Sequence, residues 1–176
     1  QLKNGFKVAF VPFPGIESVS FILTGRAGSN YEQPNEIGAA HFVEHLLFDG
    51  SRKYPSPKEL QLVILDVGGE KGGTTYREAV SYGAKVLKKD LERAFDYLSQ
   101  LTIHPLLKEA DVTRERGVII EEINRRAINP HHAFGLAVSN RLFFPSQRIS
   151  YNSAGEVMDV EKLSRDVILD FYNRYY

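Results

Sequence analysis

Residues 41–48, which read His-Phe-Val-Glu-His-Leu-Leu-Phe, constrain the fold more than any other stretch of the chain. If this stretch is helical, His41 and His45 are one turn apart and Glu44 lies on the same side of the helix. The neighbouring residues are apolar, so we expect the helix to pack inside the protein with its three polar side chains largely buried. These neighbours are Ala39, Ala40, Phe42, Val43, Leu46 and Leu47.

Three polar groups in a packed helix point to a bound metal ion, because polar groups without partners are costly to bury. Two imidazoles one turn apart can hold a metal ion from one side, and a carboxylate beside them can take a proton from water. The order H-x-x-E-H is the inverted zinc-peptidase motif, in which the glutamate precedes the second histidine. The alternative is two ordinary histidines and a solvated glutamate, and the rest of the chain decides between the two interpretations.

The composition argues against several other classes of function. The 22 basic and 22 acidic side chains cancel, which disfavours a general binder of nucleic acids or anionic membranes. The sequence contains no cysteine, so a metal ion would be bound by histidine and carboxylate. No apolar run is long enough to span a membrane. We expect one soluble domain over residues 1–176 and leave its compartment open, with the bacterial cytoplasm as one candidate.

The strand signals predict an antiparallel sheet. Residues 6–12 and 18–24 are rich in β-branched and aromatic residues and are separated by a Pro-Gly turn, which is typical of paired strands. Residues 79–86 form a further predicted strand. The glycine-rich residues 67–75 pack poorly and favour an edge strand, with a flexible hairpin as the alternative.

The helix signals complete an α+β fold, in which an antiparallel-rich mixed sheet carries helices mainly on one face. Ser56 is a predicted N-cap, followed by a proline and by Glu59 in a capping box, so a helix should begin there and run to about Asp66. The other predicted helices cover residues 90–103, 109–126, 132–144 and 160–175.

The helix at residues 109–126 offers a third ligand, since catalytic zinc usually has three protein ligands and a water. Glu115 and Glu122 are seven positions apart and share a face, whereas Glu121 points about 100° away from Glu122. Isoleucines beside Glu122 place it on the buried flank, so we predict Glu122 as the ligand and Glu115 as the acceptor that orients a ligand histidine. The alternative is an exposed helix whose arginines pair with these acids.

Together these segments resemble the family of zinc peptidases that includes pitrilysin, insulinase and mitochondrial processing peptidase. The 76 residues 46–121 between the H-x-x-E-H motif and Glu122 match the spacing typical of that family. The resemblance covers essentially the whole chain. It is carried by residues 2–8, 25–29, 38–48, 114–123 and 171–176.

The resemblance implies a role for each candidate site residue. His41, His45 and Glu122 would be the ligands of one zinc ion, Glu44 would be the general base that activates zinc-bound water, and Glu115 would support the site. The implied activity is a zinc metalloendopeptidase that hydrolyses extended or unfolded peptides.

The resemblance also implies how a peptide would bind. Phe48 would line the pocket beyond the cleaved bond, and Gly72 and Gly73 would lie in an edge strand that pairs with an extended peptide. The family commonly has an asparagine that holds the substrate backbone at the position of Gly72, so this chain departs from the pattern there.

The family implies a partner as well. Its members continue beyond the region equivalent to Tyr176 with further strands and a second, similar half that closes over the substrate like a clamshell and contributes an Arg/Tyr pair. We therefore expect residues 1–176 to be an N-terminal zinc-binding domain truncated before its last strands, which binds zinc but cleaves peptides poorly alone. The alternative function is a non-catalytic subunit that binds peptides or docks a partner.

Overall fold

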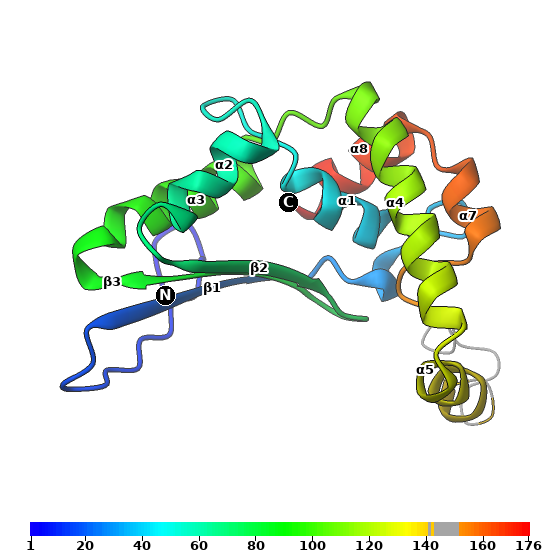
Figure 1. Ribbon diagram of the computed structural model, residues 1–176, viewed down its shortest axis with the longest axis horizontal. Coiled ribbons are helices and arrows are strands. Elements are labelled where there is room, and N and C mark those ends of the chain that lie inside the picture. Colours follow the sequence, from blue (N-terminus) through cyan, green and yellow to red (C-terminus); the bar gives the residue numbers. More distant parts are fainter. Residues whose placement is uncertain (141, 143–151) are drawn as a thin grey trace.

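The computed structural model describes residues 1–140, 142 and 152–176, and it confirms the predicted α+β fold. Three antiparallel strands form one sheet, in the order β1 (Ser18–Gly25), β3 (Val80–Leu87) and β2 (Glu70–Thr75). The helices gather on one face of this sheet and beyond one end of it (Figure 1). Among the described residues, no helix is long and apolar enough to cross a membrane.

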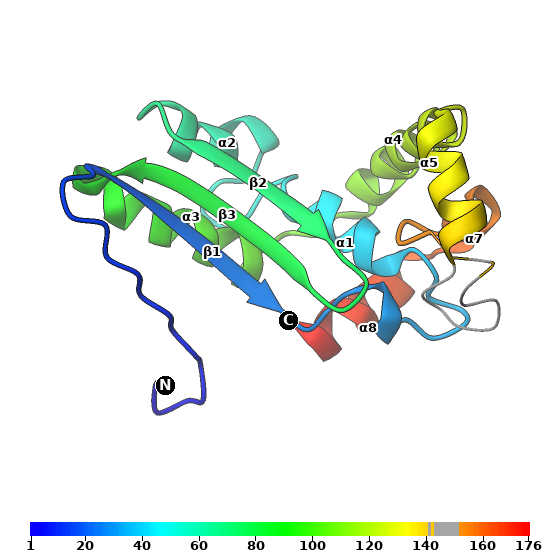
Figure 2. The same cartoon turned by 90° about the horizontal axis from the view of Figure 1, so that it is seen from below.

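The helices bring parts of the chain that are far apart in sequence together around α1 (Figure 2). The α-helices are α1 (Ala39–Leu47), α2 (Pro57–Leu65), α3 (Leu91–Ile103), α4 (Glu109–Ala127), α5 (Pro130–Phe134), α7 (Val157–Lys162) and α8 (Arg165–Tyr175). The short turns of other helix types are η1 (Ser29–Tyr31), η2 (Lys88–Asp90) and η3 (Gly135–Asn140), the last of which is a π-helix.

Local signals explain where two of these helices begin. The predicted capping box of α2 is confirmed, since the Ser56 hydroxyl accepts from the Glu59 N–H and the Glu59 carboxylate accepts from the Ser56 N–H. Gly38 leads into α1 with a φ of 94°, where a Cβ atom would lie 2.8 Å from the carbonyl oxygen of Ala154. A side chain at this position would therefore be both strained and in collision.

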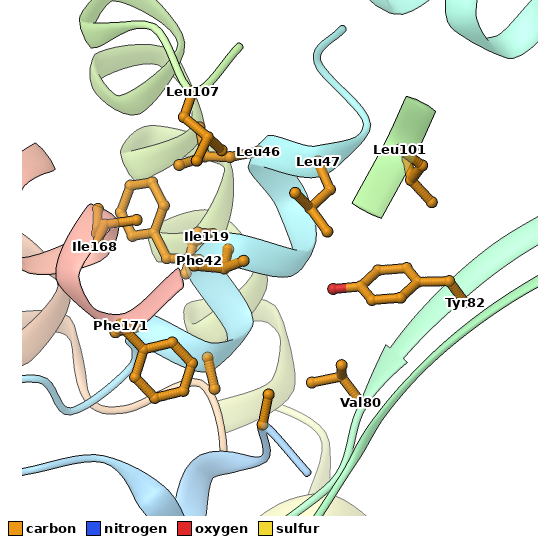
Figure 3. Packing of buried hydrophobic residues seen from close by; sticks show 14 of the residues in the cluster. Phe42, Leu46, Leu47, Val80, Tyr82, Leu101, Leu107, Ile119, Ile168 and Phe171 are labelled. Atoms are coloured by element: carbon orange, nitrogen blue, oxygen red, sulfur yellow. The ribbon is translucent and has the colours of Figure 1, made fainter. Parts of the chain in front are cut away.

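Helix α1 is the centre of the core. It packs against α4, α8 and β2, and its six apolar side chains have no exposed surface. Figure 3 shows Phe42, Leu46 and Leu47 of α1 among apolar side chains from α4, α8 and β3. The prediction of a packed helix around the H-x-x-E-H motif is therefore confirmed.

Strand β2 lies at the edge of the sheet, as predicted from its glycines. Successive residues of β2 lie on opposite faces of the sheet. Lys71, Gly73 and Thr75 are partly buried on the face toward α1 and the C-terminal end of that helix, whereas Gly72 is exposed. The close approach of β2 to α1 depends on Gly73, where a Cβ atom would lie 2.9 Å from Cε2 of Phe48.

Two secondary-structure predictions were wrong, and a third is only partly tested. Residues 6–12 form no strand, and Phe6, Val8 and Phe10 are 48%, 61% and 83% exposed. The apolar pattern is present, but a strand also needs a neighbouring edge to bond with, and residues 1–17 run away from the sheet (Figure 2).

The predicted helix at residues 160–175 is two helices, α7 and α8. Leu163 is extended, with φ −64° and ψ 115°, and the Ser164 hydroxyl accepts from the N–H of Val167 to start α8. The capping preference of Ser164 thus outweighs the continuous apolar pattern. The helix predicted at 132–144 begins at Pro130 and continues as a π-helix to Asn140, and part of its remainder lies outside the described residues.

We predict that Gly73→Ala destabilises the chain by about 1–3 kcal/mol, because the added methyl group overpacks the contact with Phe48. Urea-induced unfolding followed by circular dichroism would measure the change. Gly72→Ala is the matched control, because a Cβ atom there has no neighbour within 4 Å. Equal effects of the two substitutions would contradict the argument for a close approach at Gly73.

Candidate metal centre

Two histidines of α1 and one glutamate of α4 meet at one point. The Oε2 atom of Glu122 lies 3.4 Å from Nε2 of His41 and 3.4 Å from Nε2 of His45. One ligand atom from each of the three residues can be chosen so that all lie within 4.8 Å of one another. The three side chains are largely buried, with 8%, 18% and 17% of their surfaces exposed for His41, His45 and Glu122.

These separations fit a tetrahedral metal site. Atoms that bind zinc at about 2.0–2.2 Å in a tetrahedron are about 3.3–3.6 Å from one another. The distances from Glu122 to both imidazoles fall in this range, and the donor set of two nitrogens and one oxygen is one that zinc accepts. Two of the three separations therefore match a tetrahedral zinc site and the third is within 4.8 Å, so the residues present can hold a zinc ion.

Glu115 contacts the outer nitrogen of one histidine, as the shared face of α4 predicts. Its Oε2 atom lies 3.0 Å from Nδ1 of His45. When the Nδ1–H of neutral His45 donates a hydrogen bond to this carboxylate, the lone pair of the ring is on Nε2, the nitrogen that lies 3.4 Å from Glu122. This contact is the one that an acceptor orienting the His45 ring would make.

Glu44 lies beside the three residues and is held by β2. The hydroxyl of Thr75 donates to Glu44 Oε2 over 2.5 Å, and Nδ1 of His41 is 3.6 Å from the same oxygen. Burial raises the pKa of Glu44, but the contacts with His41 and Thr75 outweigh it and leave the pKa below its usual value. Glu44 is therefore ionised at neutral pH and able to accept a proton.

Two arginines of α4 complete the charge balance. Arg126 pairs with Oε1 of Glu122, and Arg114 pairs with Asp49 at 2.6 Å, with Asp111 at 2.8 Å and more loosely with Glu115 at 3.3 Å. The arginine–glutamate pairing that was the alternative interpretation of this helix is thus present together with the metal geometry.

Sequence reasoning assigned no role to Thr75, and it treated Arg114 and Arg126 only as possible partners of acids. For Thr75 the available signal was its position at the end of the glycine-rich strand, which does not reveal what faces it across the fold. For the arginines the signal was helical spacing, since Arg126 is four residues from Glu122 and Arg114 is three residues from Asp111.

A hollow of about 270 Å³ opens at these residues. The end of β2 forms one side of it and α4 forms another, so the edge strand runs past the three candidate ligands. Phe48, Gly72 and Gly73 line an adjoining hollow. The structure thus brings every sequence-predicted site residue to one region. The first hollow is lined by His41, Glu44, His45, Gly73, Thr74, Thr75, Glu122, Arg126 and Ser153.

The ion pairs set the charge of the imidazoles in the metal-free chain. Burial lowers the pKa of His45, but the hydrogen bonds to Glu115 and Glu122 outweigh it and raise the pKa from 6.5 to about 9. The same balance of burial against carboxylate contacts raises the pKa of His41. The histidine contacts, that of His41 first, hold the pKa of Glu122 well below its usual range.

Comparison with known proteins finds a family and several relatives. The family model described as Insulinase (Peptidase family M16) matches residues 7–143. An uncharacterized zinc protease of Streptomyces coelicolor is 34% identical, and the beta subunit of the mitochondrial-processing peptidase of Rattus norvegicus is 31% identical, each over 99% of this chain. The chain spans only 38% and 35% of the lengths of these two relatives.

Solved structures share the fold. The periplasmic protease PqqL of Escherichia coli superposes with a TM-score of 0.81 at 23% identity, covering 90% of this chain and 18% of its own. A peptidase M16 inactive domain from Pseudomonas fluorescens superposes with a TM-score of 0.79 at 16% identity, covering 90% of this chain and 38% of its own. The fold therefore occurs in a domain called inactive as well as in a protease, and the site residues must distinguish the two.

We predict that the chelator-treated chain loses stability as the pH rises from 6.5 to about 9. In this window the unfolded histidine has lost its proton while folded His45 keeps its own, so folding takes up a proton. His45 alone then lowers the free energy of unfolding by up to about 1.4 kcal/mol per pH unit. Urea unfolding in EDTA at successive pH values would measure the slope.

The control for this prediction is Glu115→Gln, which removes a carboxylate from His45 and should flatten the decline. A free energy of unfolding that stays constant or rises between these pH values in the unsubstituted chain would contradict the assigned ion pairs.

Proposed function

The chain belongs to the insulinase family of peptidases, family M16, and on that premise we propose that it is the zinc-binding, catalytic-type domain of an endopeptidase acting on extended or unfolded peptides. The observation that carries the proposal is the position of Glu122 Oε2, 3.4 Å from the Nε2 atoms of both His41 and His45, with the Glu44 carboxylate alongside. Acids and imidazoles in this arrangement suit a metal-assisted hydrolysis.

His41, His45 and Glu122 would hold the zinc ion, and Glu115 would keep the His45 ring in the orientation that presents Nε2. A bound zinc ion would supply a Lewis acid that lowers the pKa of water toward neutrality and polarises a carbonyl group. The buried, hydrogen-bonded surroundings of the two rings limit their movement and so preserve the geometry.

Glu44 would act as the proton acceptor. Its contacts with Thr75 and His41 both use Oε2, which leaves Oε1 as the oxygen available to a water molecule in the hollow. The lowered pKa keeps the carboxylate ionised before the reaction. After taking the proton from water, Glu44 would pass it to the nitrogen of the departing peptide.

The outer edge of β2 would bind the substrate backbone. Within the described part of the chain β2 pairs only with β3, so its other edge is open to an additional strand. A peptide on this edge would run past Glu44, because Thr75 of the same strand contacts that carboxylate. Recognition through backbone hydrogen bonds would make specificity depend on extended shape more than on sequence.

The partner of this domain would be a second, homologous half or subunit that covers the peptide. One relative is called a subunit, and the chain spans about two-fifths or less of the two relatives named above. The alternative function, a non-catalytic peptide-binding or partner-docking domain, has a precedent in the fold of the inactive Pseudomonas fluorescens domain. Retention of all the candidate ligands and of Glu44 favours the catalytic function.

We predict that Glu122→Gln weakens zinc binding at least about 10- to 100-fold, because the ligand oxygen loses its charge. Competition with a chromophoric chelator would measure the affinity. Glu121→Gln is the matched control, since Glu121 is the adjacent acid and is exposed. Unchanged zinc affinity in Glu122→Gln would overturn the ligand assignment.

We predict that Glu44→Gln, in the protein complete with its proposed second half, keeps the zinc affinity and lowers kcat for peptide cleavage by about 100- to 10,000-fold, the range expected when a general base is removed. Zinc content by elemental analysis and turnover of a quenched fluorescent peptide would be measured on the same preparation. Cleavage by the substituted chain at the unsubstituted rate would refute the mechanism. A protein complete with its second half that binds zinc and peptides but shows no cleavage before substitution would support the non-catalytic alternative.

A further inference from the structure

A second hollow, of about 390 Å³, adjoins the metal centre and holds charged groups that the proposed reaction does not use. It shares Glu44, His45 and Gly73 with the first hollow and extends past Phe48 toward α2. Two further side chains in its lining carry hydrogen-bond donors, the ammonium group of Lys71 and the amide of Gln61.

Lys71 stands on the inward side of β2 and covers an aromatic ring. Its Nζ atom lies 5.0 Å from the centroid of Phe48, within the range of a cation–π contact. Burial lowers the pKa of this lysine, as expected for an ammonium group partly removed from water. None of the ion pairs among the described residues includes Lys71.

The carboxylates in the same hollow each have a partner. Glu44 accepts from Thr75, Glu115 contacts His45, and Asp49 pairs with Arg114. Within the part of the chain that the structure describes, the ammonium group of Lys71 therefore has no ion-pair partner, whereas each of these acids contacts another group, with Oδ2 of Asp49 left without a hydrogen bond. No hydrogen bond of the Gln61 amide is present in that part either, so two donors face the hollow without an acceptor.

We propose that this hollow takes the side chain of the substrate residue that follows the cleaved bond, and that Lys71 makes it prefer an acidic side chain. The proposal rests on the proposed peptidase function and adds a substrate preference to it. A peptide on the edge of β2 alternates its side chains, so one next to the bond at Glu44 can enter the hollow beside Phe48. Its methylene groups would pack on the Phe48 ring and its carboxylate would meet the donors of Lys71 and Gln61.

The test compares peptides that differ only in the residue after the cleaved bond, with glutamate, glutamine or lysine there. With the zinc-loaded protein, complete with its proposed second half, we expect kcat/KM for the glutamate peptide to exceed that for the glutamine peptide about tenfold, as for a partly buried charge-assisted contact. In Lys71→Gln this ratio should fall to about one, and in Lys71→Glu the lysine peptide should be favoured.

Lys85→Gln is the matched control, because Lys85 lies on the adjacent strand with its side chain exposed and paired with Glu70. This variant loses the same charge and should keep the preference of the unsubstituted chain. A loss of preference in Lys85→Gln equal to that in Lys71→Gln would overturn the proposal in favour of a general effect of net charge.

Equilibrium binding of the same peptides to the zinc-loaded Glu44→Gln chain separates this proposal from the proposed function. Tighter binding of the glutamate peptide that depends on Lys71, without cleavage by the unsubstituted protein complete with its second half, would support the pocket and refute hydrolysis. Cleavage of all peptides at similar rates would support the peptidase and overturn the acidic preference. Neither binding nor cleavage of any peptide would overturn both.

Discussion

Burial of the helix α1 is the constraint from which the arrangement of the site follows. The helix packs against α4, α8 and β2 and has no exposed apolar surface, yet it carries three ionisable side chains on one side. Such groups are costly to bury without partners, so the elements that cover α1 must supply hydrogen bonds. Helix α4 supplies the carboxylates of Glu115 and Glu122, and β2 supplies the hydroxyl of Thr75. Packing of the core and assembly of the site therefore depend on the same contacts.

The carboxylates of α4 create an electrostatic requirement of their own. Acidic groups in a small, poorly hydrated volume repel one another, and a helix can relieve this only with cations at neighbouring positions. Arg114 engages Asp49, Asp111 and Glu115 on one side of the site, and Arg126 engages Glu122 on the other. Arg126 contacts Oε1 of Glu122, which leaves Oε2 facing the Nε2 atoms of both histidines. Arg114 contacts Oε1 of Glu115, which leaves Oε2 in contact with Nδ1 of His45. Helix α4 can therefore carry arginine–glutamate ion pairs and also contribute a carboxylate to the candidate metal site.

Local signals in the sequence predicted the parts of the structure that depend on local chemistry. The capping box at Ser56, the edge position of the glycine-rich strand and the packed H-x-x-E-H helix are confirmed, and Glu115 and Glu122 lie on the face of α4 that was predicted. The predictions that were wrong or missing concern positions where two local signals compete and positions whose partners are distant in the sequence. Residues 6–12 have the composition of a strand but no edge to pair with, and Ser164 divides a helix that apolar periodicity predicts to be continuous. The contact between Thr75 and Glu44 joins residues 31 positions apart and depends on the tertiary fold.

The hydrogen bond between Thr75 and Glu44 connects the strand edge to the proposed proton acceptor, and this connection has a consequence for where a substrate would be cut. Backbone hydrogen bonds fix the register of an added strand, and a slip by one residue turns every side chain to the opposite face. A bound peptide could therefore shift along β2 only by two residues while keeping the same side chains toward α1. Alternative cuts that keep the same side chains toward α1 would then be an even number of residues apart, counted along β2 from Thr75, and cuts an odd number apart would present the opposite set of side chains.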